Sequence, residues 1–232
     1  MREYLLEGLK KAEIEIENLN IDGLCGYLEH LKKVNSITNL TAIRDDKEII
    51  EKHFIDALFL TKFISSNVKS AIDIGTGAGF PGMVLAIALP NINFTLTDSI
   101  EKKTSFLREV KEILGLENVE VITARSEELV KDGRREKYDL GLCRGVAELR
   151  VIMEYVIPFI KVNGIFLSQK MSEDEIANAD NALNILNSKI NYVHKFNLPY
   201  SNDSRVVIEI EKIETTDEKY PRRAGIAVKR PL

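Results

Sequence analysis

From Ser70 onward, short apolar runs alternate with amphipathic stretches of helical length, and the runs read AIDI, FTLTD, VEVIT, YDLGLC and GIFLSQ. Strands that alternate with helices in this way are typical of a parallel sheet with helices on both faces. The rhythm then changes, because INYVHKFNLP and SRVVIEIEK are two strand-like runs joined by the polar turn 200–204. Such a pair indicates an antiparallel hairpin. We therefore predict an α/β fold with a mostly parallel, seven-stranded sheet and a C-terminal antiparallel hairpin.

The first 66 residues have a different pattern, with apolar side chains at helical spacing, as in Leu24, Leu28 and Leu31. We predict that residues 1–66 form a helical cap packed on the core and that residues 67–232 form the α/β domain. The chain has 232 residues, 44% of them hydrophobic, which is the size of one such domain with additions. Both parts are therefore expected to form a single structural unit.

The sequence contains no segment that indicates a membrane or an export route. Its longest apolar run, residues 83–90, is too short to cross a bilayer, and the charged start MREYLLEGLKK is unlike a signal peptide. Cys25 and Cys143 lie in segments predicted as a helix and a strand end, which argues against a disulfide framework. We expect a cytoplasmic protein that does not bind membranes.

Neither a metal nor a second subunit is indicated. The three histidines, His30, His53 and His194, are too scattered in the sequence to suggest a metal site. The amphipathic N-terminal helices are expected to pack on the core of their own chain rather than on a partner. We therefore expect a monomer without a bound metal.

The C-terminal tail is basic although the net charge of the chain is −4. Between Lys219 and Leu232 there is no acidic residue, and the cations are Lys219, Arg222, Arg223, Lys229 and Arg230. A basic patch on an acidic body binds phosphates without making the whole surface attractive to polyanions. The tail is therefore a candidate site for nucleic acid.

A glycine-rich loop, DIGTGAGFPG, begins at Asp73 and follows the first strand-like run. In open α/β sheets ligands bind beyond the carboxyl ends of the strands, and Gly75, Gly77 and Gly79 permit positive φ angles and a close approach of the ligand. Such glycines alone indicate only a tight turn. However, Asp98 ends the next run, 21 residues after Gly77, where a carboxylate accepts hydrogen bonds from both ribose hydroxyls. The combination predicts a nucleoside-containing cofactor.

Two cofactors satisfy this pattern, because Gly77-x-Gly79-x-x-Gly82 also matches the dinucleotide fingerprint. The carboxylate of Asp73 beside the loop would repel a pyrophosphate. S-adenosylmethionine has no phosphate and carries a sulfonium and an ammonium, both of which an acid attracts. We therefore predict S-adenosylmethionine, with S-adenosylhomocysteine as product, and keep a nicotinamide enzyme as the alternative.

Another polar stretch, Ala124-Arg-Ser-Glu-Glu128, follows the third strand-like run. Ser126 could cap a helix whose first turn carries acids that the helix dipole favours. Ser126 and Glu127 could instead surround the adenine of the cofactor. Both interpretations are compatible and stay open at this point.

The acceptor of the methyl group is expected near Cys143-Arg144-Gly145, after the fourth run. This segment lacks the Asn/Asp-Pro-Pro-aromatic run of exocyclic-amine methyltransferases and the prolines that usually flank a nucleophilic cysteine. Guanine N7 has an exposed lone pair and no proton, so its methylation needs positioning but no general base. Arg144 and Lys170, at strand ends, are predicted to position the nucleotide and so to be the catalytic residues. The alternative is that each is a solvated loop cation.

Segments along nearly the whole chain resemble the RsmG (GidB) family of methyltransferases. They read NLTAI at 39–43, KHFIDAL at 52–58, IDIGTGAGFPG, LTDSIEKKTSFLREV, CRGVAEL and YPRRAGIAVKRPL. Many methyltransferases share the glycine loop, but the NLTAI segment and the basic tail are more specific. The resemblance implies a Rossmann-like class I methyltransferase. It would act on N7 of a guanosine in the decoding-region loop of 16S rRNA, with the small ribosomal subunit as partner.

The resemblance also implies roles for individual residues. Cofactor contacts are expected at Gly75, Phe80, Ser126, Glu127 and Arg144. Apart from the resemblance, the basic charge of the tail predicts RNA contacts at Arg222, Arg223, Lys229 and Arg230, and we also expect RNA contacts at Asn39 and His53. For Asn39, Thr41 and His53, roles in helix capping and packing are equally open.

The chain also departs from the family pattern. It has Cys143-Arg144-Gly145 and Lys170-Met171, where the family often has Ser-Arg-Ala and Lys-Gly. These departures bear on the shape of the base pocket rather than on the donor site. A non-catalytic RNA-binding or assembly factor, and a methyltransferase for another substrate, are kept as alternatives.

Overall fold

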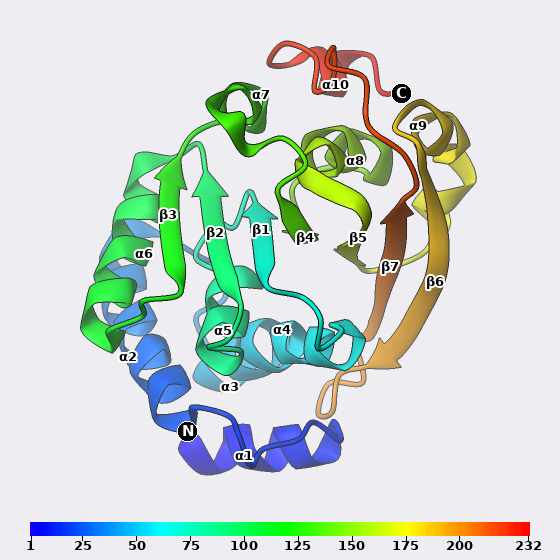
Figure 1. Cartoon of the computed structure of the whole chain (residues 1–232). Coiled ribbons are helices and arrows are strands. Elements are labelled where there is room, and N and C mark those ends of the chain that lie inside the picture. Colours follow the sequence, from blue (N-terminus) through cyan, green and yellow to red (C-terminus); the bar gives the residue numbers. More distant parts are fainter.

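The computed structural model describes residues 1–232, and its centre is one seven-stranded sheet (Figure 1). The strands are β1 (Ser70–Ile74), β2 (Asn93–Asp98), β3 (Val119–Thr123), β4 (Tyr138–Arg144), β5 (Ile160–Lys170), β6 (Ser188–Asn197) and β7 (Ser204–Lys212). Their order in the sheet is β3-β2-β1-β4-β5-β7-β6. The first five are parallel, and β7 runs antiparallel to both β5 and β6. The predicted fold class, including the C-terminal hairpin, is confirmed.

The order of the strands reverses at β1, which has β2 on one side and β4 on the other. The register places Asp73 of β1 beside Leu142 of β4, so the carboxyl ends of these two strands are neighbours. Helices that follow β1 and β4 leave toward different faces and open a crevice between them. The crevice lies where the glycine loop and Arg144 follow their strands.

Side chains alternate between the two faces of the sheet, as the pleat of a strand requires. Ala71 and Leu142 belong to a cluster of 39 buried residues on one face, whereas Ile72 and Cys143 belong to a cluster of 22 on the other. Helices α5 (Gly82–Ala88) and α6 (Glu101–Leu114) contribute to the first cluster. Helices α8 (Leu149–Val156) and α9 (Asp180–Ile185) contribute to the second. The sheet is therefore the middle of three layers.

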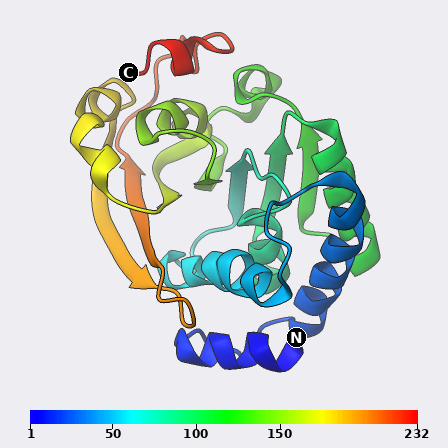
Figure 2. The same ribbon diagram turned by 180° about the vertical axis from the view of Figure 1, so that it is seen from behind.

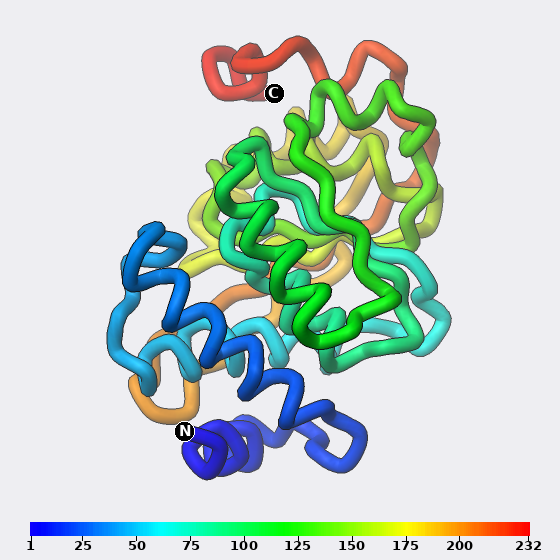
Figure 3. The backbone as a smooth tube through the Cα atoms, turned by 90° about the vertical axis from the view of Figure 1, so that its left-hand side faces the viewer, coloured from blue at the N-terminus to red at the C-terminus, as the bar shows by residue number.

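The helices predicted for the first 66 residues are present, and their apolar side chains belong to the larger cluster. They are α1 (Arg2–Lys11), α2 (Ile21–Thr38), α3 (Asp46–Ile49), a π-helical turn (Ile50–Ile55), α4 (Asp56–Leu58) and a 3₁₀ turn (Phe59–Phe63). Asn20 caps α2 by accepting a hydrogen bond from the Gly23 amide at 2.8 Å. Figure 2 shows α2 and the segment 46–63 on the near side of the sheet, and Figure 3 shows α2 beside α6.

The remaining elements are short. They are α7 (Ser126–Leu129), a π-helical turn (Val130–Arg134), two 3₁₀ turns (Ile157–Phe159 and Asp174–Asn178) and α10 (Ile226–Lys229) in the tail. Both cysteines are free thiols, with Cys143 buried. None of the helices combines the length and apolar character needed to span a bilayer. Nowhere do three or more histidine, cysteine or acidic side chains gather as they would around a metal ion.

Candidate cofactor and nucleotide site

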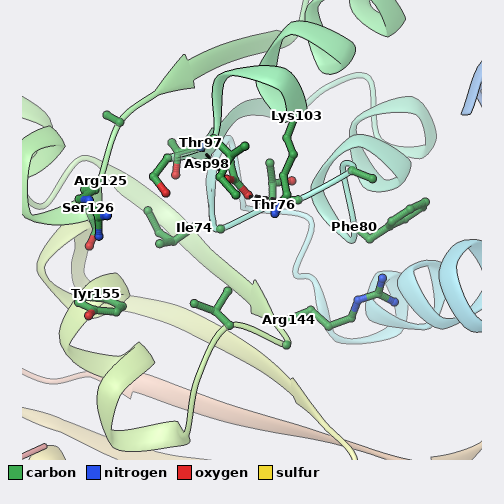
Figure 4. A pocket seen from close by; sticks show the side chains of 18 of the residues that line it. Ile74, Thr76, Phe80, Thr97, Asp98, Lys103, Arg125, Ser126, Arg144 and Tyr155 are labelled. Atoms are coloured by element: carbon green, nitrogen blue, oxygen red, sulfur yellow. Dashed lines mark hydrogen bonds and ion pairs between the residues drawn. The ribbon is translucent and has the colours of Figure 1, made fainter. Parts of the chain in front are cut away.

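Two adjoining cavities lie at the crevice beside β1 and β4. The larger, of about 470 Å³, is lined by residues 74–78 of the glycine loop, 97–100 after β2, 124–127 after β3 and 144–146 after β4 (Figure 4). The second, of about 400 Å³, lies beyond the end of β5. Arg144, Gly145 and Val146 line both cavities. The end of β4 is therefore the boundary at which a ligand in one cavity meets a ligand in the other.

Two glycines of the glycine loop are needed for different reasons. Gly77 has a φ of +63°, and a Cβ atom built on it would meet nothing within 4 Å, because the residue lines the larger cavity. Gly79 has a φ of +100°, and its Cβ would lie 2.5 Å from the Tyr27 hydroxyl and 2.7 Å from Cβ of Met83. Gly79 is thus required for packing, whereas Gly77 keeps space open for a ligand.

Asp73 lies beneath this loop and is completely buried. Its Oδ2 accepts hydrogen bonds from the Thr76 hydroxyl at 2.7 Å and from the Gly82 amide at 2.8 Å, and Oδ1 has no partner. Burial raises the pKa of Asp73 to about 6. Asp73 is outside the set of residues that line the cavity. Its observed contacts fix the loop, and its predicted contact with the cofactor stays a prediction.

Asp98, in contrast, lines the cavity at the end of β2. Its Oδ2 accepts a hydrogen bond from the Gly77 amide at 3.0 Å and from Lys103 Nζ at 3.3 Å, and Oδ1 accepts one from the Ile100 amide at 2.9 Å. These donors hold the carboxylate at the edge of the glycine loop. This is the position in which a carboxylate receives ribose hydroxyls in the Rossmann-like arrangement.

Ser126 and Glu127 line the same cavity from the start of α7. Arg125 occupies the N-cap position of this helix without a side-chain hydrogen bond, so the interpretation of Ser126 as the helix cap is wrong. The Ser126 hydroxyl instead lies 3.4 Å from Glu127 Oε2. Glu127 and Glu128 occupy the first turn, as the helix dipole favours.

Arg144 reaches from β4 to the N-terminal helical segment. Its Nη1 donates to the Lys52 carbonyl at 3.0 Å and to Asp56 Oδ2 at 3.2 Å, and its Nη2 lies 3.0 Å from His53 Nδ1. Its side chain is 18% exposed, and its guanidinium lies over the ring of Phe80. Arg144 is therefore an anchored side chain, and the alternative of a solvated loop cation is wrong.

His53 combines the two roles left open for it, because it packs and also lines the cavity. Its ring stacks on Phe80 with the ring centres 4.4 Å apart. Nδ1 lies 3.0 Å from Arg144 Nη2 and 3.1 Å from the Lys52 carbonyl, and Nε2 lies 2.8 Å from the Thr41 hydroxyl. A guanidinium only donates, so the contact with Arg144 assigns Nδ1 as the acceptor and places the ring proton on Nε2, which donates a hydrogen bond to Thr41. Burial, with a smaller effect of the Arg144 charge, lowers the pKa of His53 to about 3. The imidazole is therefore neutral near pH 7.

Lys170 is also not a solvated cation. Its side chain is 9% exposed, and Nζ donates to the Ala147 carbonyl at 2.6 Å and pairs with Glu175 Oε2 at 2.7 Å. It lines the second cavity, beside the end of β5. The fold thus brings Arg144 and Lys170 to one cavity, as their positions at strand ends predict.

The other predicted RNA contacts lie outside both cavities. Asn39 ends α2 with a φ of +51°, and its side chain accepts a hydrogen bond from Arg44. Arg222 forms a forked ion pair with Glu154, with distances of 2.6 Å from Nη2 to Oε2 and 2.9 Å from Nε to Oε1. The other tail cations, Arg223, Lys229 and Arg230, are exposed. The tail lies beyond α7 and α8, at the end of the molecule toward which β1, β2 and β3 point (Figure 1).

The pair formed by Arg222 and Glu154 leads to a stability prediction. Because the Glu154 side chain is fully buried, Arg222→Ala would leave its carboxylate without a countercharge and lower the free energy of unfolding by about 3 kcal/mol. Arg223→Ala is the matched control and is expected to change it by less than about 0.5 kcal/mol. Urea unfolding of the three proteins measures both values. Equal stabilities of the two variants would contradict the structural role of Arg222.

Comparison with known proteins places the chain in a family. The family described as "GidB: rRNA small subunit methyltransferase G" matches residues 20–204. This chain belongs to that family. The ribosomal RNA small subunit methyltransferase G of Fusobacterium nucleatum is 58% identical over 233 residues, which cover all of both chains. The protein of the same name from Acetivibrio thermocellus is 44% identical and is covered over 97% of its length. The family predicted from the sequence is confirmed.

Solved structures similar to this member of the methyltransferase G family share its fold. The structure described as "M. jannaschii TYW2 in complex with AdoMet" has a TM-score of 0.58 and 18% identity, over 74% of this chain and 80% of that one. A SAM-dependent methyltransferase from Aquifex aeolicus has a TM-score of 0.54 and 15% identity, over 80% and 98% of the two chains. The Rossmann-like methyltransferase fold is thereby confirmed.

Three residues of the second cavity were missed by the sequence analysis as site residues. They are Asp56, Gln169 and Arg205. Asp56 Oδ2 lies 3.2 Å from Arg144 Nη1 and 3.3 Å from Arg205 Nε, so one carboxylate joins two guanidiniums. The available signal was weak, because it consisted of single charged or polar residues inside apolar stretches.

Proposed function

We propose that this protein transfers the methyl group of S-adenosylmethionine to N7 of a guanosine in the decoding-region loop of 16S ribosomal RNA. Methylation of small-subunit rRNA with S-adenosylmethionine as donor follows from membership of the family. The choice of N7 and of the decoding-region loop is the part that we propose. The small ribosomal subunit is then the partner, and we propose a monomeric enzyme that acts in the cytoplasm.

The ion pairs of the two acidic residues in the second cavity are the observation that supports N7 as the acceptor. Asp56 is held by Arg144 and Arg205, and Glu175 is held by Lys170 and by the Leu149 amide. Both carboxylates are already paired with cations, which favours a role in positioning side chains over a role as proton acceptors. An exocyclic amine must lose a proton when it is methylated, whereas N7 has none to lose. An aligned nitrogen lone pair is therefore the acceptor that these residues suit best.

The larger cavity has the features that the donor requires. Gly77 leaves room where any side chain would intrude, and Asp98 presents a carboxylate at the ribose position. We propose that Gly75, Gly77, Phe80, Asp98, Ser126, Glu127 and Arg144 hold this cofactor, with Asp73 and Gly79 supporting the loop. When bound, S-adenosylmethionine supplies an electrophilic methyl group. The protein orients the acceptor across the boundary at Arg144.

We propose different roles for the basic residues of the site and for those of the C-terminal tail. Arg144 and Lys170 position the nucleotide beside the donor. The exposed Arg223, Lys229 and Arg230 contact phosphates of the RNA, which favours binding at low salt. Asn39 and His53 support the nucleotide side of the site. For Arg222, the ion pair with Glu154 favours a role in holding the tail in place.

The proposal is tested by removing N7 from the substrate. Small subunits are assembled with 16S rRNA in which the guanosines of the decoding-region loop are replaced by 7-deazaguanosine, and matched subunits carry ordinary guanosine. Both are incubated with the protein and methyl-labelled S-adenosylmethionine. We expect label in the guanosine RNA and none in the 7-deaza RNA. Equal labelling of the two would assign the methyl group to another atom.

A further inference from the structure

Gln169, at the end of β5, lines the second cavity and carries a buried hydrogen-bond acceptor without a partner. The residue is 5% exposed and lines this cavity. Its Oε1 has no hydrogen-bond partner in the protein. A buried acceptor without a partner is costly, so such an atom on a residue that lines a cavity points to a ligand that donates to it.

The orientation of the amide is set by Asp56. Nε2 of Gln169 donates to the Asp56 carbonyl at 3.0 Å and lies 3.3 Å from Asp56 Oδ1. Both are acceptors, so rotating the amide by half a turn would place Oε1 against two oxygens. The amide nitrogen therefore stays hydrogen-bonded to Asp56, and Oε1 is left without a donor from the protein.

Asp56 is itself held firmly in this position. Its carboxylate accepts from Arg144 and from Arg205 and donates to neither, which is the pattern of an ionised carboxylate. Burial raises the pKa of Asp56, and the two guanidiniums oppose that shift. The network thus links the boundary residue Arg144 to the orientation of Gln169, its neighbour in the sheet register.

The surroundings of Gln169 suit a flat, polar base. Arg144, Arg205 and Lys170 line the cavity with donors, and Val146 and Met171 are large, exposed apolar side chains among the lining residues. Guanine carries an N1–H and a 2-amino group on its Watson–Crick edge, and both are donors. Adenine has no 2-amino group and an acceptor at N1, so this part of its edge offers no donor to Oε1.

We propose that Gln169 is a specificity-determining residue, whose Oε1 accepts a hydrogen bond from the 2-amino group on the Watson–Crick edge of the target guanine. The proposal rests on the proposed function, because it takes guanosine as the methyl acceptor. It adds that the second cavity holds the base and that one side-chain oxygen selects guanine there. Loss of such a hydrogen bond at a buried acceptor costs about 10- to 100-fold in transfer efficiency.

The test compares two substrates that both retain N7. Small subunits carry either guanosine or inosine at the target position, and inosine lacks only the 2-amino group. For the wild type, we expect kcat/KM to be about 10-fold or more higher with guanosine. In Gln169→Met, which keeps the volume but lacks the acceptor, we expect this ratio to fall to about 1. A general loss of structure lowers both rates and leaves their ratio unchanged.

Ser168→Ala is the matched control for Gln169→Met. Ser168 is the preceding residue of β5, is fully buried and also has a hydroxyl without a partner, but it does not line this cavity. Its variant should keep the wild-type ratio. If the wild type methylates guanosine and inosine equally at N7, or if Gln169→Met keeps the preference, the role of Gln169 is refuted. Absence of N7 methylation by the wild type on both substrates would instead refute the proposed function.

Discussion

Gly77→Asp is expected to abolish binding of S-adenosylmethionine while the protein remains folded. The Cβ position of Gly77 opens into the larger cavity, and a side chain there would occupy the space of the ligand. The new carboxylate would also stand beside Asp98, whose Oδ2 accepts from the Gly77 amide. We expect the Kd for the cofactor to rise by about 100-fold or more, which corresponds to about 2.7 kcal/mol. Isothermal titration calorimetry measures this change directly.

Gly133→Asp is the matched control, because Gly133 has a φ of +73° and a free Cβ position as well. It lies on an exposed turn outside both cavities. Both variants therefore incur a similar cost of about 1 kcal/mol for a left-handed residue other than glycine. Only Gly77→Asp should lose the cofactor. Normal affinity in Gly77→Asp would mean that the donor does not lie over this loop.

Arg144→Ala is the second substitution with a large expected effect, because Arg144 forms the boundary between the two cavities. We expect kcat/KM for methyl transfer to fall by about 100-fold, the usual effect of misplacing a reacting group by about 1 Å. The fold should persist, since Asp56 keeps Arg205 as its countercharge. The free energy of unfolding is expected to fall by about 1 to 3 kcal/mol. Transfer assays and urea unfolding measure the two effects separately.

Arg150→Ala provides the control for Arg144→Ala. Arg150 forms an ion pair with Glu148 near the surface, six residues farther along the chain. Loss of that pair should cost less than about 1 kcal/mol and leave transfer unchanged. Normal turnover by Arg144→Ala would exclude Arg144 from the reaction.

Much of the sheet was predictable because its strands are short and buried and follow strong local signals. The glycine loop follows the first strand directly, and Asp98 ends the next strand at a typical spacing. The donor side of the site could therefore be located from the sequence. The direction of a single side chain was harder to predict. Asp73 was expected beside the cofactor, which stays a prediction, and the sequence did not show that its carboxylate also fixes the loop through Thr76 and Gly82.

The second cavity could not be predicted because its residues come together only in the folded chain. Asp56 and Arg205 are 149 positions apart, and Asp56 and Gln169 are 113 apart. The same reason applies to Arg222, which in the sequence resembles the other tail cations. Its partner Glu154 is 68 residues away and buried in α8. Local patterns identify charged residues but do not show which of them are neutralised by a distant partner.

The proposed reaction is tested most directly by mapping the methyl group on the natural substrate. The purified protein is incubated with methyl-labelled S-adenosylmethionine and small ribosomal subunits that lack the modification, and the label is assigned to a nucleotide and an atom. We expect one methyl group per subunit, on N7 of a guanosine in the decoding-region loop. Label on another atom or in another region of the RNA would contradict it, as would no label at all from a protein that binds the cofactor.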